Sequence, residues 1–233
     1  MKYLLSAIGA LALTLGTGVV MLERPAAQTN DGGVPNFDWD PLFYEELPNR
    51  WTTGQIGGIS VDDRDHTWIA HRPASVAPTM RTAADNPRAS RCCTPAPPIL
   101  EFDQNGKFVR AFGGPSDAYE WPTTEHGVYA DHKGNVWVAG NGKGDNHILK
   151  FTNTGKFVMQ IGKRNQAKGS NDTANVHGAA AMVVFPKTNE LFVADGYTNR
   201  RVIVFDADTG AYKRHWGAYG KPPDDTIKIP PRP

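Results

Sequence analysis

The side chains of this 233-residue chain that are able to do chemistry are spread along it rather than gathered in one motif. Its seven histidines form no dense cluster, and the sequence contains no H-E-x-x-H, paired C-x-x-C or G-x-S-x-G pattern. The glycine-rich stretch GNGKGDNH at 140–147 is not followed by a helix pattern that would help to cradle a phosphate. Local motifs alone therefore assign no reaction to this chain.

The two cysteines, Cys92 and Cys93, are neighbours in the sequence. Their Cα atoms would lie about 3.8 Å apart across a trans peptide, which is closer than in ordinary disulfides. Two interpretations stand side by side: a pair of thiols in a loop, or a vicinal disulfide that stiffens the loop in an oxidising compartment. Prolines follow the pair at positions 95, 97 and 98, so we expect a loop outside the central strands.

Composition points to a single all-β domain. The formal net charge is +1 and the basic residues are scattered, which argues against a nucleic-acid partner. The chain contains 24 Gly, 18 Pro and 6 Trp, and such turn-rich, aromatic sequence is typical of all-β folds. A length of 233 residues is enough for one substantial core.

The N-terminus carries the pattern of an export signal. One lysine precedes an apolar run from Tyr3 to Leu22, and small residues follow at Ala26 and Ala27. We predict a signal peptide over residues 1–27, cleaved after Ala27, with an uncleaved membrane anchor as the alternative. The rest of the protein would then be periplasmic or extracellular. No second apolar run of that length occurs, so we expect no membrane contact beyond this segment.

One sequence pattern, which we call the repeated phrase, occurs three times: ILEFDQNGKFVRAFGG at 99–114, ILKFTNTGKFVMQIGK at 148–163 and VIVFDADTGAYKRHWG at 202–217. Its turn glycine recurs at Gly106, Gly155 and Gly210, with spacings of 49 and 55 residues. Each phrase follows two further short strands, so each unit predicts four antiparallel strands, as in a β-propeller blade. We expect innermost strands near 57–61, 127–131 and 179–184. Aromatic residues at equivalent places should pack between blades: Phe102, Phe151 and Phe205, and Trp68, Trp137 and Phe192.

The predicted fold is thus an all-β propeller of about three to four four-stranded blades. Residues 28–56 would form an N-terminal extension with the first strands, and 57–217 the blades, interrupted by an insertion at 73–98. The tail, 218–233, has five prolines from Pro222 onwards and is predicted to be disordered. So few blades would leave strand edges open. Truncation, a frameshift in the reading or assembly with a second chain would each account for the count.

Residues 54–217 resemble NHL repeats, which build six-bladed propellers. The order of three motifs is similar to the peptidyl-α-hydroxyglycine α-amidating lyase domain: GGISVDDRDHTWIAHRP at 57–73, EHGVYADHKGNVWV at 125–138 and ELFVADGYTNRRVIVF at 190–205. That family cleaves a carbinolamide to a peptide amide and glyoxylate. It uses a zinc ion held by histidines in the central cavity, with a calcium ion nearby. The CCTPAPP insertion resembles exported bacterial relatives, which implies a bacterial source.

Carried over to this sequence, the resemblance implies five site residues. Arg72 would bind the substrate carboxylate, and Tyr197 would serve as the catalytic base. His126 would be a zinc ligand, and the carbonyls of Ile59 and Val128 would bind calcium. The family's other zinc histidines lie in later blades that this sequence does not contain, and Thr198 replaces a cysteine beside Tyr197. Zinc catalysis needs about three protein ligands, so the predicted zinc site is incomplete.

Strand order places three of these residues at one end of the propeller. Arg72 ends a second strand, His126 precedes a first strand and Tyr197 follows a second strand. In an antiparallel blade the end of strand two lies beside the start of strand one. We therefore expect a shared cleft that binds a small molecule or peptide at the channel face. Another protein chain is a possible partner through the open blade edges. The alternative function is a zinc-dependent carbon–nitrogen lyase that needs the missing blades, so whether the chain is an enzyme stays open.

Overall fold

The computed structural model describes residues 28–29, 35–36 and 45–227. The chain divides into two units, residues 1–42 and 43–233. In the first unit β1 (Gln28–Thr29) pairs antiparallel with β2 (Pro35–Asn36). The predicted signal peptide, 1–27, lies outside the described residues. Among the residues that are described, no helix has the length and apolar character needed to span a bilayer.

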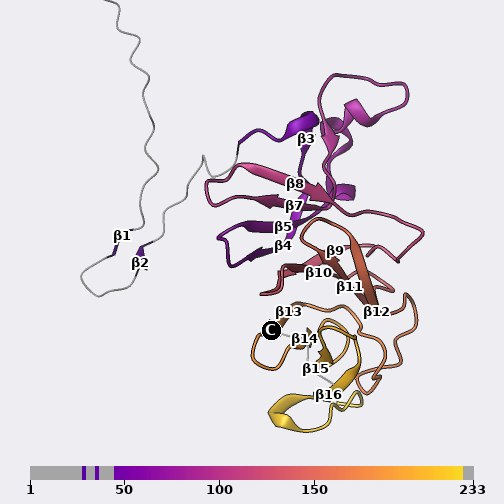
Figure 1. Ribbon diagram of the computed structural model, residues 1–233. Coiled ribbons are helices and arrows are strands. Elements are labelled where there is room, and N and C mark those ends of the chain that lie inside the picture. Colours follow the sequence, from indigo (N-terminus) through magenta and orange to yellow (C-terminus); the bar gives the residue numbers. More distant parts are fainter. Residues whose placement is uncertain (1–27, 30–34, 37–44, 228–233) are drawn as a thin grey trace, which may run out of the picture. The chain divides into compact units, whose positions relative to one another are not determined.

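The second unit is built of three four-stranded antiparallel blades, which follow one another in Figure 1. Blade 1 contains β4 (Gln55–Val61), β5 (Thr67–Arg72), β7 (Ile99–Phe102) and β8 (Phe108–Phe112). Blade 2 contains β9 (Glu125–Ala130), β10 (Asn135–Gly140), β11 (His147–Thr152) and β12 (Phe157–Gly162). Blade 3 contains β13 (Ala181–Phe185), β14 (Glu190–Asp195), β15 (Arg201–Asp206) and β16 (Tyr212–Trp216). The all-β propeller fold expected from the repeat is confirmed.

The repeated phrase forms the outer hairpin of each blade. Gly106, Gly155 and Gly210 lie in its turn with φ of 76°, 84° and 72°, a left-handed conformation that glycine adopts without steric cost. Five of the six aromatic residues at the predicted places pack inside, whereas Phe192 is half-buried. Trp68, Trp137 and Phe151 are fully buried, and Phe205 is 1% exposed. Hydrophobic clusters between blades 1 and 2 and between blades 2 and 3 form the core.

A buried carboxylate organises the turn after the innermost strand in blades 1 and 2. Asp62 accepts hydrogen bonds from backbone N–H groups two and four residues later, and from the indole Nε1 of Trp68 at 3.0 Å. Asp131 repeats the arrangement, with Trp137 Nε1 at 2.8 Å. In blade 3 Phe185 stands at this position and Phe192 replaces the tryptophan, so there is no indole donor to satisfy.

The long insertion packs beside blade 1 without joining its sheet. It contains three short 3₁₀ helices, η2 (Pro73–Ser75), η3 (Pro78–Met80) and η4 (Thr82–Ala84). Its strand β6 (Thr94–Pro95) pairs parallel with β3 (Trp51–Thr52), which follows η1 (Pro48–Arg50). Cys92 and Cys93 are joined by a disulfide and lie outside every strand, as expected for the loop. The disulfide is therefore the alternative that the structure adopts.

Part of the C-terminal tail differs from the predicted disorder. Residues 218–227 begin with η5 (Ala218–Gly220) and are held against the body of the unit. Asp225 accepts hydrogen bonds from the backbone N–H and the hydroxyl of Ser170. Arg200 Nη1 donates to the Asp224 carbonyl at 2.9 Å. The prediction of disorder is wrong for these residues, because polar side chains between the prolines bind the blade.

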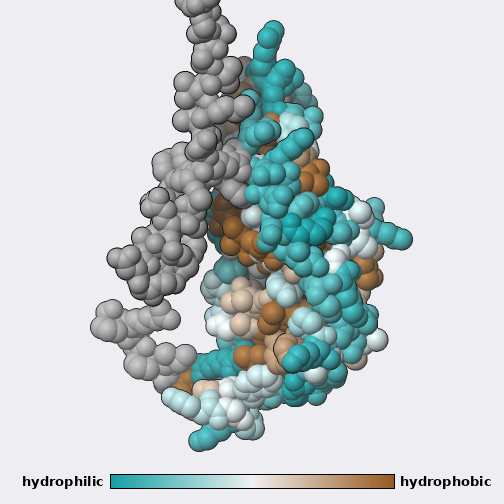
Figure 2. Space-filling view, turned by 60° about the vertical axis from the view of Figure 1, so that its left-hand side comes forward, coloured by the Kyte–Doolittle hydropathy of each residue, from teal (hydrophilic) through white to brown (hydrophobic). Residues whose placement is uncertain are grey.

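The surface shown in Figure 2 is mostly hydrophilic, but hydrophobic side chains reach it in several separate areas. The innermost strands of the two outer blades contribute large exposed apolar residues. Ile59 is 67% exposed on β4, and Val183 is 48% exposed on β13. A monomeric protein seldom leaves large apolar areas exposed without a use for them.

Two buried histidines should make the fold sensitive to mild acid. His71 and His147 are 0% and 1% exposed, and burial lowers the pKa of each ring. The unfolded chain binds these protons near pH 6.5, whereas the folded chain resists them. The free energy of unfolding should thus be highest above that pH and should fall as the pH drops from 7 towards 5. Urea denaturation at both pH values measures the change. His71→Gln should reduce the difference between them, and an identical difference would contradict the assignment.

Candidate functional site

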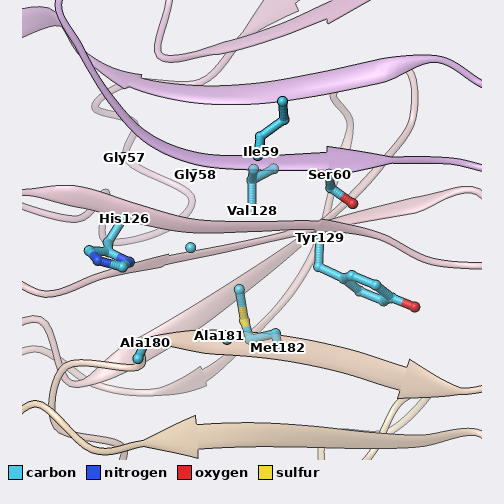
Figure 3. A pocket seen from close by; sticks show the side chains of 11 residues that line it. Gly57, Gly58, Ile59, Ser60, His126, Val128, Tyr129, Ala180, Ala181 and Met182 are labelled. Atoms are coloured by element: carbon cyan, nitrogen blue, oxygen red, sulfur yellow. The ribbon is translucent and has the colours of Figure 1, made fainter. Parts of the chain in front are cut away.

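The innermost strands of the three blades, β4, β9 and β13, line a cavity of about 190 Å³ on the channel side of the propeller. Figure 3 shows its lining residues, with Val128 directed towards β4 and Tyr129 towards β13. Polar groups come from His126 and Ser60, while Ala180, Ala181 and Met182 supply an apolar wall. The cavity has room for a small ligand or for one end of a longer one.

Two glycines let the innermost strands of blades 1 and 2 approach closely. A Cβ atom on Gly57 would lie 2.5 Å from the carbonyl oxygen of Glu125, and one on Gly58 would overlap the His126 carbonyl. The close approach brings the end of β5 next to the start of β9. As a result Arg72 donates from Nε to the Glu125 carbonyl at 2.9 Å.

His126 and Tyr197 meet at the same end of the blades. The Tyr197 hydroxyl lies 2.6 Å from His126 Nε2, and the two rings meet edge-on with centroids 5.0 Å apart. Tyr197 is 55% exposed, whereas His126 is half-buried at the edge of the cavity. The structure therefore brings together all three predicted residues: Tyr197 contacts His126, and Arg72 binds the carbonyl of the residue before it. Their catalytic and metal-binding roles stay predictions.

Each blade fixes the segment that leads into its innermost strand with one buried acceptor. His71 Nδ1 accepts from Gly54 N–H at 3.1 Å, and Asp195 Oδ1 accepts from His177 N–H at 2.8 Å. Asp145 accepts from the N–H groups of Thr123, Thr124 and Gly142 and from the Thr123 hydroxyl. The three acceptors are fully buried. They hold the chain on either side of the site.

Sequence reasoning missed these anchoring residues. Two of them could have been found from their equivalent positions in the repeat, because His71 and Asp195 both follow an alanine at the end of the second strand of a blade. Asp145 stands instead in the loop after β10, where strand register gives no guide. Gln55 was also missed; its side-chain oxygen accepts from Arg72 Nη1 at 3.2 Å and orients the guanidinium.

His126 is neutral at pH 7 in this environment. Burial lowers the pKa of its ring, and the positive charge of Arg72 lowers that pKa further. The Ala180 carbonyl opposes the shift, although His126 Nδ1 is buried and makes no well-aligned hydrogen bond. With the proton on Nδ1, Nε2 is free to accept the hydrogen bond that the Tyr197 hydroxyl donates.

Removing the charge of Arg72 should raise the pKa of His126. Arg72→Gln keeps a polar side chain of similar reach but deletes the cation that disfavours protonation. NMR titration of the histidine ring carbons reports this pKa directly. Arg110→Gln is a suitable control, because Arg110 pairs with Glu101 within blade 1. An unchanged pKa in Arg72→Gln would show that the two side chains do not interact.

The predicted calcium residues occupy neighbouring strands beside the cavity. Ile59 and Val128 stand at equivalent positions of β4 and β9, each opposite the residue that follows the buried tryptophan. Both line the cavity, but Val128 is 8% exposed and Ile59 is 67% exposed. Calcium takes six to eight oxygen ligands, and these two carbonyls would supply only a part of them.

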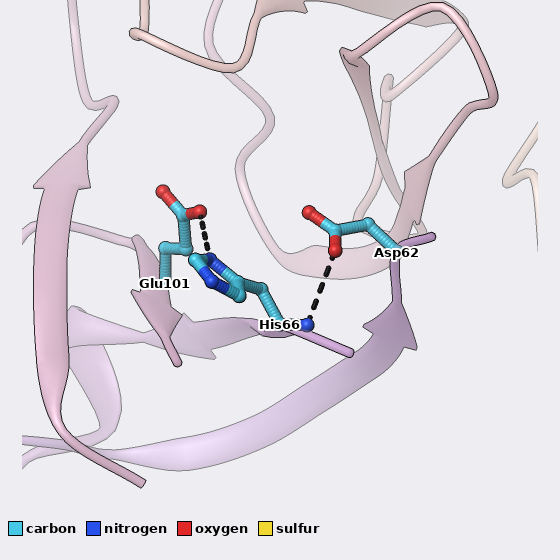
Figure 4. Close-up of side chains that lie close together, drawn as sticks. All are labelled: Asp62, His66 and Glu101. Atoms are coloured by element: carbon cyan, nitrogen blue, oxygen red, sulfur yellow. Dashed lines mark hydrogen bonds and ion pairs between the residues drawn. The ribbon is translucent and has the colours of Figure 1, made fainter. Parts of the chain in front are cut away.

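Within the described residues one group of potential metal ligands stands close together: Asp62, His66 and Glu101 (Figure 4). It lies at the turn of blade 1 and not at the channel cavity. His66 Nδ1 lies 2.7 Å from Glu101 Oε1, and Arg64 binds both carboxylates at 2.5 and 2.8 Å. Arg110 Nε reaches the second Glu101 oxygen at 2.6 Å. Because arginines already neutralise both carboxylates, the group works as an ion-pair network of the blade.

The described channel residues do not fit a catalytic zinc site. Such a site needs about three protein ligands and one open position. His126 lines the cavity, its Nε2 is hydrogen-bonded to Tyr197, and it belongs to no group of three His, Cys, Asp or Glu ligands among the described residues. His177 forms no such group and uses its backbone N–H to bind Asp195. The site as described is a polar triad beside a cavity.

No family model matches the chain. A Caenorhabditis elegans protein described as a probable peptidyl-α-hydroxyglycine α-amidating lyase is 34% identical over 156 residues, which cover 66% of this chain and 42% of that protein. Peptidylglycine α-amidating monooxygenase of Rattus norvegicus is 26% identical over 183 residues, covering 77% and 17%. The Mus musculus enzyme of that name is 25% identical over 190 residues, covering 77% and 19%.

Two solved structures also align with the chain. Kuenenia stuttgartiensis hydrazine synthase gives a TM-score of 0.41 at 15% identity, covering 69% of this chain and 36% of that one. The extracellular domain of a one-component system from B. thetaiotaomicron gives 0.39 at 11% identity, covering 80% and 21%. The chain spans less than half the length of each of these three curated relatives. By sequence it is similar to proteins named for peptide α-amidation, in agreement with the order of its three motifs.

Proposed function

We propose that this chain is an exported propeller that binds a small molecule or a peptide end at the channel face, where Arg72, His126 and Tyr197 meet. The observation that carries the proposal is the 2.6 Å contact between the Tyr197 hydroxyl and His126 Nε2, beside the Arg72 guanidinium and the mouth of the cavity. A cation, a phenol and a neutral imidazole converge there from three different blades.

A carboxylate-bearing ligand matches these groups. Arg72 uses Nε and Nη1 for Glu125 and Gln55, and its Nη2 donors have no hydrogen-bond partner among the described residues. A carboxylate is the preferred partner of a guanidinium, because charge and hydrogen bonding act together. The half-exposed Tyr197 hydroxyl supplies a second polar contact. The similarity to proteins named for peptidyl-α-hydroxyglycine cleavage supports a ligand of this chemical class.

A second function is favoured by the same contact. Tyr197 and the neutral His126 form an acid–base pair that is able to move a proton between phenol and imidazole. An N-acyl-α-hydroxyglycine would lose its hydroxyl proton to this pair. Its C–N bond would break to leave an aldehyde, and the departing amide nitrogen would take the proton back. Zinc and calcium, proposed from the resemblance, enter no step here because the described ligands are too few.

Calorimetry with an N-acyl-α-hydroxyglycine tests the binding proposal. We expect measurable binding by the full chain and at least a 10-fold loss of affinity in Arg72→Ala, since a charged hydrogen-bonding partner is removed. Arg214→Ala is the matched control, because Arg214 pairs with Glu190 on the outer part of blade 3. Equal affinity in both variants would overturn the proposal.

Product analysis separates the lyase alternative from simple binding. The chain is incubated with the same compound, with and without added zinc, and the released glyoxylate is measured. Cleavage that is lost in Tyr197→Phe, with binding retained, supports the lyase. Binding without release of glyoxylate would support the binding function and argue against the lyase. Export is tested by fractionating the host cells and sequencing the mature N-terminus, which should begin at Gln28.

A further inference from the structure

Strand register defines equivalent positions in the three blades, and the same position differs sharply in burial from blade to blade. We call the side of a blade that faces the preceding blade its first face, and the side towards the following blade its second face. Blade 2 is covered on both faces by its neighbours. Blade 1 has no described blade before it, and blade 3 has none after it.

The first face of blade 1 is an uncovered blade interface. Two residues of its innermost strand, Ile59 and Val61, are 67% and 57% exposed. The residues that hold the same register positions in the other blades pack against the preceding blade: Val128 at 8%, Ala130 at 8%, Met182 at 8% and Val184 at 0%. Ile59 and Val61 are therefore as apolar as their buried equivalents, although no described blade packs on them.

The second face of blade 3 is uncovered in the same way. Ala194 is exposed and Val202 is half-buried. Their register equivalents are all 0% exposed: Ala70 and Ile99 in blade 1, Ala139 and Ile148 in blade 2. On the innermost strand of blade 3, Val183 and Phe185 are 48% and 44% exposed. Both end faces are thus built like buried interfaces.

The segment before blade 1 is already placed as an interface requires. Between blades 1 and 2 the connecting segment inserts Tyr119 against Phe157, with ring centroids 5.0 Å apart. Before blade 1, Trp51 packs against Phe108, the register equivalent of Phe157, at 5.9 Å. This segment therefore covers the outer part of the first face, as its counterpart does between two blades. The innermost strand is left for a neighbouring blade.

The two end faces are complementary, because every interface in the chain joins a second face to a first face. A second copy of this chain offers both an uncovered first face and an uncovered second face. Propellers close with about four to eight blades, and six is the multiple of three in that range. Two copies related by a two-fold axis would form two equal interfaces and leave no open face. We propose that this chain dimerises head to tail, so that blade 3 of each copy packs on blade 1 of the other and closes a six-bladed ring.

The test begins with the mass of the full chain in sedimentation equilibrium. We expect twice the 25.4 kDa of one chain. At the interface between blades 1 and 2, Ser60 accepts a hydrogen bond from Ala130 N–H at 3.1 Å. Register makes Val183 the equivalent of Ser60, and Val61 that of Ala130. Val183→Glu and Val61→Lys should thus each place an unpaired charge in both interfaces and give monomers.

Mixing the two variants distinguishes the head-to-tail ring from any other dimer. A mixed dimer has one Glu–Lys interface and one unaltered interface, so the mixture should sediment at twice the chain mass. Val158→Glu is the control, because Val158 is 45% exposed on β12 of the blade that has both neighbours. It should remain dimeric. Circular dichroism checks that each variant is folded.

Four results would overturn the proposal. One is a monomeric unaltered chain, which would mean that something other than a second copy covers these faces. Another is a dimer that both charged variants leave intact. A third is a mixture of the two variants that stays monomeric. The fourth is a series of larger assemblies, which would show head-to-tail contacts that fail to close.

Discussion

Asp195→Ala is expected to lower the free energy of unfolding by about 3–5 kcal/mol, because it leaves the Arg201 charge buried without its partner. Both side chains of this ion pair are 0% exposed, and Arg201 Nε lies 2.9 Å from Asp195 Oδ2. Asp195 also accepts from His177 N–H and from Asn199 Nδ2, at 2.8 Å each. Losing the acceptor would release the segment that leads into β13. Urea denaturation followed by circular dichroism measures the change.

A surface pair provides the contrast. Lys133 Nζ lies 2.9 Å from Asp208 Oδ2, but the two side chains are 42% and 55% exposed. Exposed pairs of this kind contribute about 0–1 kcal/mol, because water and salt screen them. Lys133→Ala should therefore unfold at nearly the same urea concentration as the unaltered chain. Similar losses in Lys133→Ala and Asp195→Ala would refute the importance of burial here.

Trp137→Ala should be comparably damaging, with a loss of about 3–5 kcal/mol for a large cavity in the core. Trp137 is 0% exposed and belongs to the hydrophobic cluster that joins blades 2 and 3. Lys150 Nζ lies 4.9 Å from its ring centroid, so the lysine would lose its cation–π contact as well. Thermal melting and urea denaturation both report the effect.

Trp137→Phe separates packing from hydrogen bonding at this position. The variant keeps an aromatic ring but deletes the indole donor to Asp131, so we expect a smaller loss of about 1–3 kcal/mol. Blade 3 already has Phe192 at the equivalent place, with Phe185 in place of the carboxylate. Because Asp131 also accepts from the N–H groups of Lys133 and Asn135, adding Asp131→Phe to Trp137→Phe should lower stability further, but by less than Asp131→Phe alone. A double variant less stable than the sum of both single ones would argue against the pairing.

The repeated phrase was enough to predict the blades, because hairpin turns and strand alternation are local properties. Innermost strands expected near 57–61, 127–131 and 179–184 are found at Gln55–Val61, Glu125–Ala130 and Ala181–Phe185. The turn glycines likewise mark the predicted hairpins. Strand order also placed Arg72, His126 and Tyr197 at one end, where the structure has them.

Contacts between distant, irregular segments escaped prediction. The parallel pairing of β3 with β6 joins residues around 51 and 94, and each strand has two residues. No periodicity extends over two residues, so the sequence carries no signal for it. The hydrogen bonds from Ser170 to Asp225 were equally unpredictable, because the proline content of the tail indicated disorder. The anchoring role of Asp145 depends on a loop whose path the repeat does not determine.

Folding order should follow from the carboxylate-centred turns of blades 1 and 2. Asp62 and Asp131 bind groups two, four and six residues further along the chain. Closing such short loops costs little chain entropy, so the β4–β5 and β9–β10 hairpins are able to form before distant contacts. Blade 3 has Phe185 at this position and depends more on docking against blade 2. We expect the transition state to be structured around Trp137, with blade 3 consolidating later.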